Sequence, residues 1–166
     1  MVLRQASLWL LIEAAAGMGK SVLLAQLSQR LGVAVQRGLL PPEPAPITLW
    51  DLDANTAPQR LAESIVAGER RLILAKRPQQ DIPGLARAAA YGRVLRLGET
   101  ALQFTLEELE AHFPARIAAR LLEQSGGWPL LLGLPHPFGP EMETFLREEV
   151  VAPLGTAELF DLRDRL

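Results

Sequence analysis

The sequence contains no cysteine, only two histidines and 5% aromatic residues. Without cysteine, the chain can form neither disulfide bonds nor thiolate metal sites, and it has no thiol nucleophile. His112 and His136 lie far apart in the sequence and lack the ligand spacing of a zinc site. We therefore expect neither disulfide bridges nor a zinc centre.

Long apolar runs and a basic excess are also missing. No run approaches the ~20 residues that a membrane helix needs, so no membrane association is expected. The formal net charge is -2 with Lys and Arg spread along the chain, and direct nucleic-acid binding is not expected because it needs a basic tract. Arg4 precedes an apolar run, as in a secretory signal, but Glu13 interrupts it. The cytoplasm is the expected compartment.

The sequence is rich in aliphatic residues, arranged as strand and helix patterns that alternate. The 166 residues, 49% of them hydrophobic, fit one main domain. Short apolar runs predict buried strands at residues 8–12, 33–35, 47–50, 72–75 and 94–97. Helical patterns lie between them at residues 20–31, 58–67 and 82–90. This alternation predicts an α/β core over residues 1–100, with a parallel sheet flanked by helices.

The second part of the chain, residues 101–166, has a helical pattern. Thr105 and Glu108 have the spacing of a capping box, which predicts a helix to about His112. Further elements are expected at residues 115–124, 130–134, 141–151 and 156–166. This part would form a small helical lid and the start of a following helical region. The last helix looks cut short at the chain end, so we expect the natural protein to continue.

A glycine-rich segment follows the first predicted strand. In EAAAGMGKSVLL, residues 13–24, Gly17 and Gly19 allow backbone N–H groups to wrap around an anion. Lys20 would reach the terminal phosphates of a nucleotide and Ser21 would ligate Mg²⁺. The expected nucleotide-binding residues are Ala16, Gly17, Met18, Gly19, Lys20, Ser21 and Val22. The alternative is an ordinary turn before a helix, with Lys20 solvated.

Four segments together resemble one family. They are AAAGMGKSVLLAQL at 14–27, RRLILAKRP at 70–78, LQFTLEEL at 102–109 and SGGWPLLLGL at 125–134. In this order they resemble the nucleotide-binding domain of the STAND ATPases, specifically the LuxR/MalT-like signal-responsive transcriptional regulators. Ala14 stands where a phosphate-binding loop usually has its first glycine, and in this family the loop commonly begins with alanine. The resemblance implies a P-loop NTPase fold with a helical lid, and ATP or ADP with Mg²⁺ as ligands.

The resemblance assigns roles to two further residues. Arg77 matches the arginine called sensor 1, which would contact the γ-phosphate and distinguish ATP from ADP. Pro129 matches a proline that packs near the nucleotide base. Spacing alone leaves simpler interpretations open, because Arg77 could be a surface arginine before a loop proline. Likewise, Gly126 and Gly127 could end one helix while Pro129 starts the next.

The segment ITLWDLD, residues 47–53, has two interpretations. As a Walker B strand it would place Asp51 where the carboxylate holds Mg²⁺ through Ser21 or water. It also resembles an earlier family segment, in which case the true Walker B strand is missing. Leu52 occupies the position beside Asp51 where relatives usually have a second acid, so hydrolysis is left open. Lys20, Asp51 and Arg77 are the expected catalytic residues if ATP is hydrolysed.

These observations and the resemblance lead to one expected function and two alternatives. We expect an ATP- or ADP-binding STAND-type regulatory ATPase domain that acts as a nucleotide-dependent switch in a signal-responsive transcriptional regulator. Any ATP hydrolysis would be weak, and self-association or a regulatory protein partner is expected. The alternatives are a small P-loop kinase or other phosphotransferase, and a degenerate interaction module that does not hydrolyse ATP.

Overall fold

The computed structural model describes residues 9–40, 45–52, 60–61, 63–67 and 69–132, together with residues 144, 147 and 148. The chain forms two compact units. The first consists of Met1–Ala14 and Gly19–Leu102, and the second of Ala15–Met18 and Gln103–Leu166. Asp53 and the predicted helix at 156–166 lie outside the described residues, as does most of the predicted helix at 141–151.

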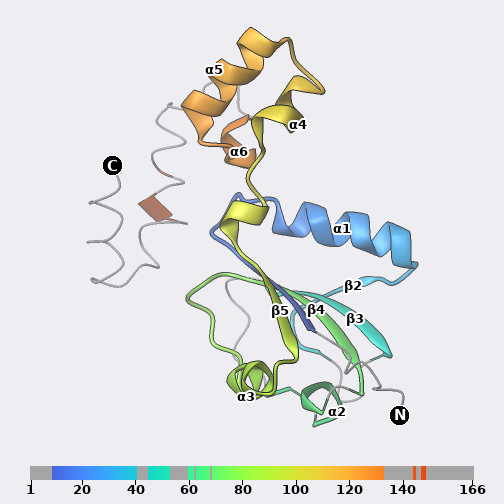
Figure 1. Ribbon diagram of the computed structural model, residues 1–166. Coiled ribbons are helices and arrows are strands. Elements are labelled where there is room, and N and C mark those ends of the chain that lie inside the picture. Colours follow the sequence, from blue (N-terminus) through green and yellow to red (C-terminus); the bar gives the residue numbers. More distant parts are fainter. Residues whose placement is uncertain are drawn as a thin grey trace. The chain divides into compact units, whose positions relative to one another are not determined.

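A five-stranded sheet forms the centre of the first unit (Figure 1). Its strands are β1 (Trp9–Glu13), β2 (Val35–Arg37), β3 (Ile47–Asp51), β4 (Arg71–Lys76) and β5 (Val94–Leu97). They lie in the order β2-β3-β4-β1-β5, and each described pairing is parallel. The predicted α/β fold with a parallel sheet flanked by helices is therefore confirmed.

The helices of the first unit are α1 (Lys20–Leu31), α2 (Glu63–Val66), α3 (Leu85–Ala90) and the short 3-10 helix η1 (Glu99–Ala101). Gly32 ends α1 as predicted, in a left-handed conformation with φ 65°. Because the Val33 N–H still donates to the Ser28 carbonyl, the next strand begins at Val35 and not at residue 33. Residues 60–61 are not helical, so the described part of the helix predicted at 58–67 is shorter.

Helix α3 also begins later than the predicted residue 82. The Leu85 N–H donates to the Ile82 carbonyl at 3.0 Å, which closes a turn before the helix. Gly84 then takes φ 99°, a value that a helical residue does not have. Residues 82–84 therefore form the entry turn of α3 and not its first turn.

Strand side chains alternate between two apolar layers, one on each face of the sheet. One layer packs Leu10, Ile12, Ile73 and Ala75 with Leu23, Leu24 and Leu27 of α1. The other packs Trp9, Leu11, Leu72 and Leu74 with Ile65 and Val66 of α2 and Leu85 and Ala88 of α3. Figure 1 shows α1 on one side of the sheet and α2 and α3 on the other. A residue's position along its strand therefore decides which helical layer it meets.

The second unit contains α4 (Leu106–Glu110), α5 (Ala115–Ser125) and α6 (Pro129–Leu132). The predicted capping box is present: Glu108 N–H donates to Thr105 Oγ1 at 3.2 Å, and Thr105 N–H donates to Glu108 Oε2 at 2.8 Å. Helix α4 ends before the predicted His112. The Leu109 carbonyl accepts from both His112 and Phe113, and Pro114 follows without an N–H to continue the helix.

No helix among the described residues is long and apolar enough to cross a membrane. Helix α1, with 12 residues, falls well short of the ~20 that a crossing needs. Its apolar side chains are instead divided between the core, where Leu24 is fully buried, and the surface, where Val22 is 62% exposed.

Candidate functional site

The glycine loop, residues 14–19, connects β1 to α1. Gly17 and Gly19 have φ values of 77° and 81°, in the left-handed region that residues with a Cβ rarely adopt. Gly19 is the N-cap of α1 and offers no side-chain acceptor. Because the first N–H groups of a helix lack acceptors within the helix, this geometry suits an anion at the start of α1.

Ala14, at the position of the usual first glycine, belongs to the core. Its side chain is fully buried, and its N–H donates to the Lys76 carbonyl at 3.4 Å. This bond continues the pairing of β1 with β4 one residue beyond the end of β1. Ala16 and Met18 are also buried, at 6% and 4% exposure. The loop therefore alternates buried apolar residues with glycines of special conformation.

Lys20, the first residue of α1, is half-buried and lies among other charges. Burial lowers the pKa of its ammonium to about 8; Arg77 lowers it further, while Asp51 and Glu99 act in the opposite direction. The structure thus brings together Lys20, Asp51 and Arg77, the three predicted catalytic residues. Glu99, from η1 after β5, joins them and was not predicted.

The sheet explains why Asp51 and Arg77 lie on the α1 side. Asp51 ends β3 and has the same position in the alternation as Leu49, which packs in the α1 layer. Arg77 follows Lys76, the last residue of β4, and the alternation continued by one residue sends its side chain toward the α1 side. Leu52 points the other way and packs in the α2 and α3 layer with 6% exposure. Leu52 therefore packs in the core, and the residue that follows Asp51 provides no carboxylate.

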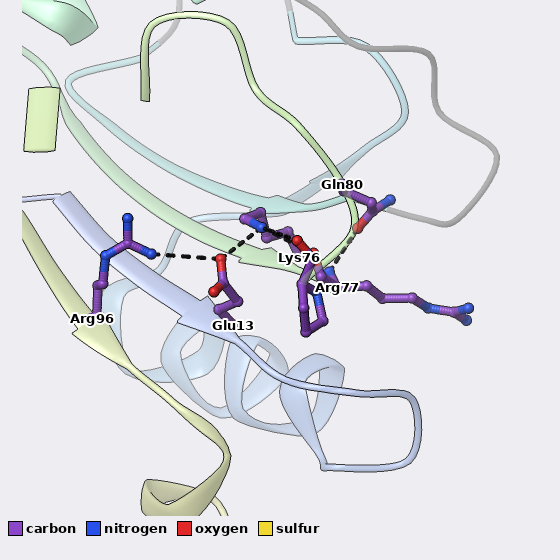
Figure 2. Close-up of polar contacts among 6 residues, drawn as sticks. Glu13, Lys76, Arg77, Gln80 and Arg96 are labelled. Carbon is purple, nitrogen blue, oxygen red and sulfur yellow. Dashed lines mark hydrogen bonds and ion pairs between the residues drawn. The ribbon is translucent and has the colours of Figure 1, made fainter. Parts of the chain in front are cut away.

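Opposite charges meet on the other face of the sheet. Lys76 Nζ lies 2.6 Å from Glu13 Oε2, and Arg96 Nη1 lies 3.6 Å from the same oxygen (Figure 2). The Lys76 side chain is 5% exposed and that of Arg96 is 52% exposed. Glu13 and Lys76 are aligned in the β1–β4 register. None of these three residues was predicted as a site residue, although each lies at or near the end of a predicted strand.

The turn after β4 is held by several hydrogen bonds. Lys76 Nζ donates to the carbonyls of Arg77 and Pro78 at 3.0 and 3.1 Å. The Arg77 N–H donates to Gln80 Oε1 at 2.7 Å, and the Gln80 N–H donates to the Arg77 carbonyl at 3.1 Å. Figure 2 shows the Arg77 side chain pointing away from Glu13 and Lys76. The backbone of Arg77 is therefore held by hydrogen bonds within the turn, while its side chain points away from Glu13 and Lys76.

In the second unit, the middle of the glycine loop packs against the segment that contains Pro129. The Leu130 N–H donates to the Gly17 carbonyl at 3.2 Å. A Cβ at Gly17 would lie 2.9 Å from Leu130 Cβ and 3.0 Å from Trp128 Nε1, so only glycine fits. Pro129 is the first residue of α6, where its missing N–H costs nothing. The predicted base-contacting proline thus lies beside two residues that touch the loop.

Trp128 differs from the other tryptophans. Trp9 Nε1 donates to the Ile65 carbonyl at 2.9 Å, and Trp50 Nε1 donates to the Gly38 carbonyl at 2.7 Å. Trp128 Nε1 is buried and has no acceptor within the described part of the chain. A buried N–H without an acceptor is uncommon in a folded protein, and here it lies next to Gly17.

The two predicted Mg²⁺ ligands both carry oxygen donors. Ser21 is exposed in the first turn of α1, and Asp51 ends β3 on the α1 side. Within the described residues, no group of three or more His, Asp or Glu side chains could hold a metal ion. A serine hydroxyl with one carboxylate suits Mg²⁺, which takes its remaining ligands from water and phosphate. The pair fits a cation that arrives with a nucleotide.

Comparison with known proteins adds no assignment. The sequence matches no protein-family model, and no curated protein shows significant similarity to it. Function is therefore inferred from the chain's own residues and their geometry.

Proposed function

We propose that this chain is a P-loop nucleotide-binding domain of the STAND type, which binds ATP or ADP with Mg²⁺ and acts as a conformational switch. The proposal rests on the conformation of the glycine loop between β1 and α1. Its glycines are left-handed, α1 has no side-chain cap, and Lys20 starts the helix. This combination provides backbone donors and a cation for phosphate groups.

The charges around Lys20 support a polyanionic ligand. Burial and Arg77 both act against the charged form of Lys20, and the lowered pKa reflects this cost. Two cations held together in a half-buried place repel each other, and a phosphate chain between them would remove the repulsion. Lys20 would contact the terminal phosphates and Arg77 the γ-phosphate. ATP and ADP would then differ in their contacts with Arg77, as a nucleotide switch requires.

Mg²⁺ would be held by Ser21 and Asp51, directly or through water. The cation would supply positive charge that offsets the charge of the phosphates. Asp51 also acts on Lys20, because its negative charge favours the protonated form. The same carboxylate therefore supports both the metal site and the lysine that reaches the phosphates.

A specific observation favours a second candidate, a module that binds nucleotide without hydrolysing it. Leu52 is buried in the core on the face away from Lys20, so it leaves no acid beside Asp51 to activate water. Among the described residues, Glu99 is the other acidic group that raises the pKa of Lys20. In either case the regulatory role, a signal-responsive transcriptional regulator that self-associates or binds a protein partner, rests on the sequence resemblance.

Calorimetric titration with ATP and ADP tests the proposal. The wild type should bind both nucleotides, with Mg²⁺ strengthening ATP binding, and Lys20→Ala should weaken binding at least tenfold because one charge-assisted contact is lost. Ser21→Ala should keep metal-free binding and lose most of the Mg²⁺ effect. Wild-type protein that binds neither nucleotide, or that binds as well after Lys20→Ala, would contradict the proposal.

A further inference from the structure

We propose that Lys76 and Glu13 are positioning residues that fix Arg77 relative to the strand entering the glycine loop. The inference rests on the proposed nucleotide function and names how that site would distinguish ATP from ADP. Neither residue would touch the nucleotide. Their ion pair would hold the turn after β4 so that the Arg77 guanidinium meets the γ-phosphate.

The contacts of Lys76 exclude a ligand-binding role for its ammonium. An ammonium has three N–H donors, and Lys76 Nζ has three acceptors: Glu13 Oε2 at 2.6 Å and the carbonyls of Arg77 and Pro78 at 3.0 and 3.1 Å. A pocket of about 280 Å³ borders this cluster, but Lys76 has no N–H left to donate to a molecule bound there. Lys76 therefore acts on the chain itself.

The pair connects the two segments that would contact the nucleotide. Glu13 is the last residue of β1 and directly precedes the glycine loop. The Ala14 N–H adds a main-chain bond to the Lys76 carbonyl at 3.4 Å. Both a side-chain contact and a backbone contact thus bind the start of the loop to the end of β4.

The turn after β4 holds the backbone of Arg77 through several hydrogen bonds. Its carbonyl accepts from Lys76 Nζ and from the Gln80 N–H, and its own N–H donates to Gln80 Oε1. Arg77 follows Lys76 by one residue, so the strand alternation directs its side chain to the α1 side, and it is close enough to Lys20 to lower the pKa of that ammonium. Figure 2 shows the Arg77 side chain leading away from Glu13 and Lys76. A shift of this turn would displace the guanidinium, and positioning errors near 1 Å can be costly for function.

Stability alone does not explain the pair. Desolvating two charges offsets much of their attraction, and apolar side chains of similar size can replace buried pairs without loss. An apolar residue at position 76 could fill the space but could not bond the carbonyls of Arg77 and Pro78. Lys76 therefore supplies two hydrogen bonds that orient the turn and that an apolar side chain would not provide.

The test is a double-mutant cycle on nucleotide preference. Dissociation constants for ADP and for a non-hydrolysable ATP analogue are measured in the wild type, Lys76→Met, Arg77→Met and the double variant. Lys76→Met should weaken the ATP analogue about tenfold, the size of one lost charge-assisted contact, and change ADP binding less than twofold. Arg77→Met should do the same. The double variant should be no weaker than Arg77→Met, because Lys76 acts through Arg77.

A second variant and a control keep the test decisive if Lys76→Met fails to fold. Glu13→Gln keeps the bonds from Lys76 to the turn and removes the charged anchor, so it should lower ATP-analogue affinity about threefold at constant ADP affinity. Arg96→Gln, which removes the longer and exposed contact to Glu13, should change neither constant beyond twofold.

Three results would overturn the positioning role. They are an unchanged ATP-to-ADP ratio in Lys76→Met, additive losses in the double variant, and equal wild-type affinity for the two nucleotides. In each case Lys20-dependent ADP binding would leave the proposed nucleotide binding standing, although equal affinities would also count against a switch. Absence of binding to the wild type would remove both.

Discussion

Lys76 Nζ lies 2.6 Å from Glu13 Oε2 and joins the ends of two neighbouring parallel strands. Breaking a buried ion pair by removing one partner costs about 3–5 kcal/mol. Because Glu13 is 29% exposed and keeps Arg96 at 3.6 Å, we expect a smaller loss for Lys76→Met, about 2 kcal/mol in the free energy of unfolding.

Replacing both partners is the matched control for this prediction. Glu13→Gln with Lys76→Met leaves no uncompensated charge, so the double variant should recover at least half of the loss in urea unfolding. A double variant no more stable than Lys76→Met would contradict the expectation that the uncompensated Glu13 charge causes the loss.

Lys20 gives a pH-dependent prediction. Its pKa in the folded protein is about 8, below the ordinary value of 10.5. The folded state releases this proton before the unfolded state does, so the charged form opposes folding. This cost is fully present below pH 8 and is relieved between about pH 8 and pH 10.5. The ligand-free protein should gain stability from this group over that window.

Nucleotide binding should reverse the effect, because phosphate charge favours the protonated ammonium. At pH 8.5 Lys20 should take up most of a proton on binding, and at pH 6.5 it should take up almost none. Calorimetry in two buffers of different ionisation enthalpy measures this number. Lys20→Arg, whose charge does not titrate in this range, should abolish the uptake at pH 8.5. The same uptake in Lys20→Arg would assign the proton to another group.

Gly17 gives a prediction with a control in the same chain. Gly17 and Gly32 both have positive φ values, 77° and 65°. A Cβ at Gly17 would lie 2.9 Å from Leu130 Cβ, whereas nothing lies within 4 Å of a Cβ at Gly32. Alanine at Gly32 should cost the left-handed strain alone, about 1 kcal/mol. Alanine at Gly17 should cost about 2 kcal/mol more, because Leu130 must move.

The two alanine variants should also differ in function. Gly17→Ala should weaken ADP binding at least tenfold by distorting the loop, while Gly32→Ala should keep ADP affinity within twofold. Unfolding and titration experiments on both variants check this. Equal losses in the two variants would mean that backbone strain alone, and not packing against Leu130, decides the result.

The local parts of this fold could be predicted from sequence. The apolar run of β1, the loop glycines and the repeat of leucines in α1 lie next to one another in the chain, so the strand-loop-helix unit was predictable. The capping box of Thr105 and Glu108 is equally local, and it was confirmed. Where the boundaries were wrong, hydrogen bonds were the cause, as at Val33, whose N–H still belongs to the end of α1.

The Glu13–Lys76 pair could not be predicted, because it depends on which strands are neighbours. β1 pairs with β4 and β5 and not with β2. No local sequence pattern determines this strand order. The order makes Glu13, Lys76 and Arg96 neighbours, and the alternation of side chains along each strand places all three on one face. The same alternation along the strands sends Asp51 and Arg77 to the other face, toward Lys20. Once the strand order is known, the charge arrangement follows from the positions of these residues along their strands.

The most direct test of nucleotide binding is an ADP titration of the wild type and Lys20→Ala, with adenosine as the ligand control. We expect saturable ADP binding to the wild type and at least tenfold weaker binding to a folded Lys20→Ala. Adenosine should bind much more weakly to both, because the proposed glycine loop recognises phosphate. Equal ADP affinity in the two proteins, or adenosine binding as tight as ADP binding, would contradict this expectation.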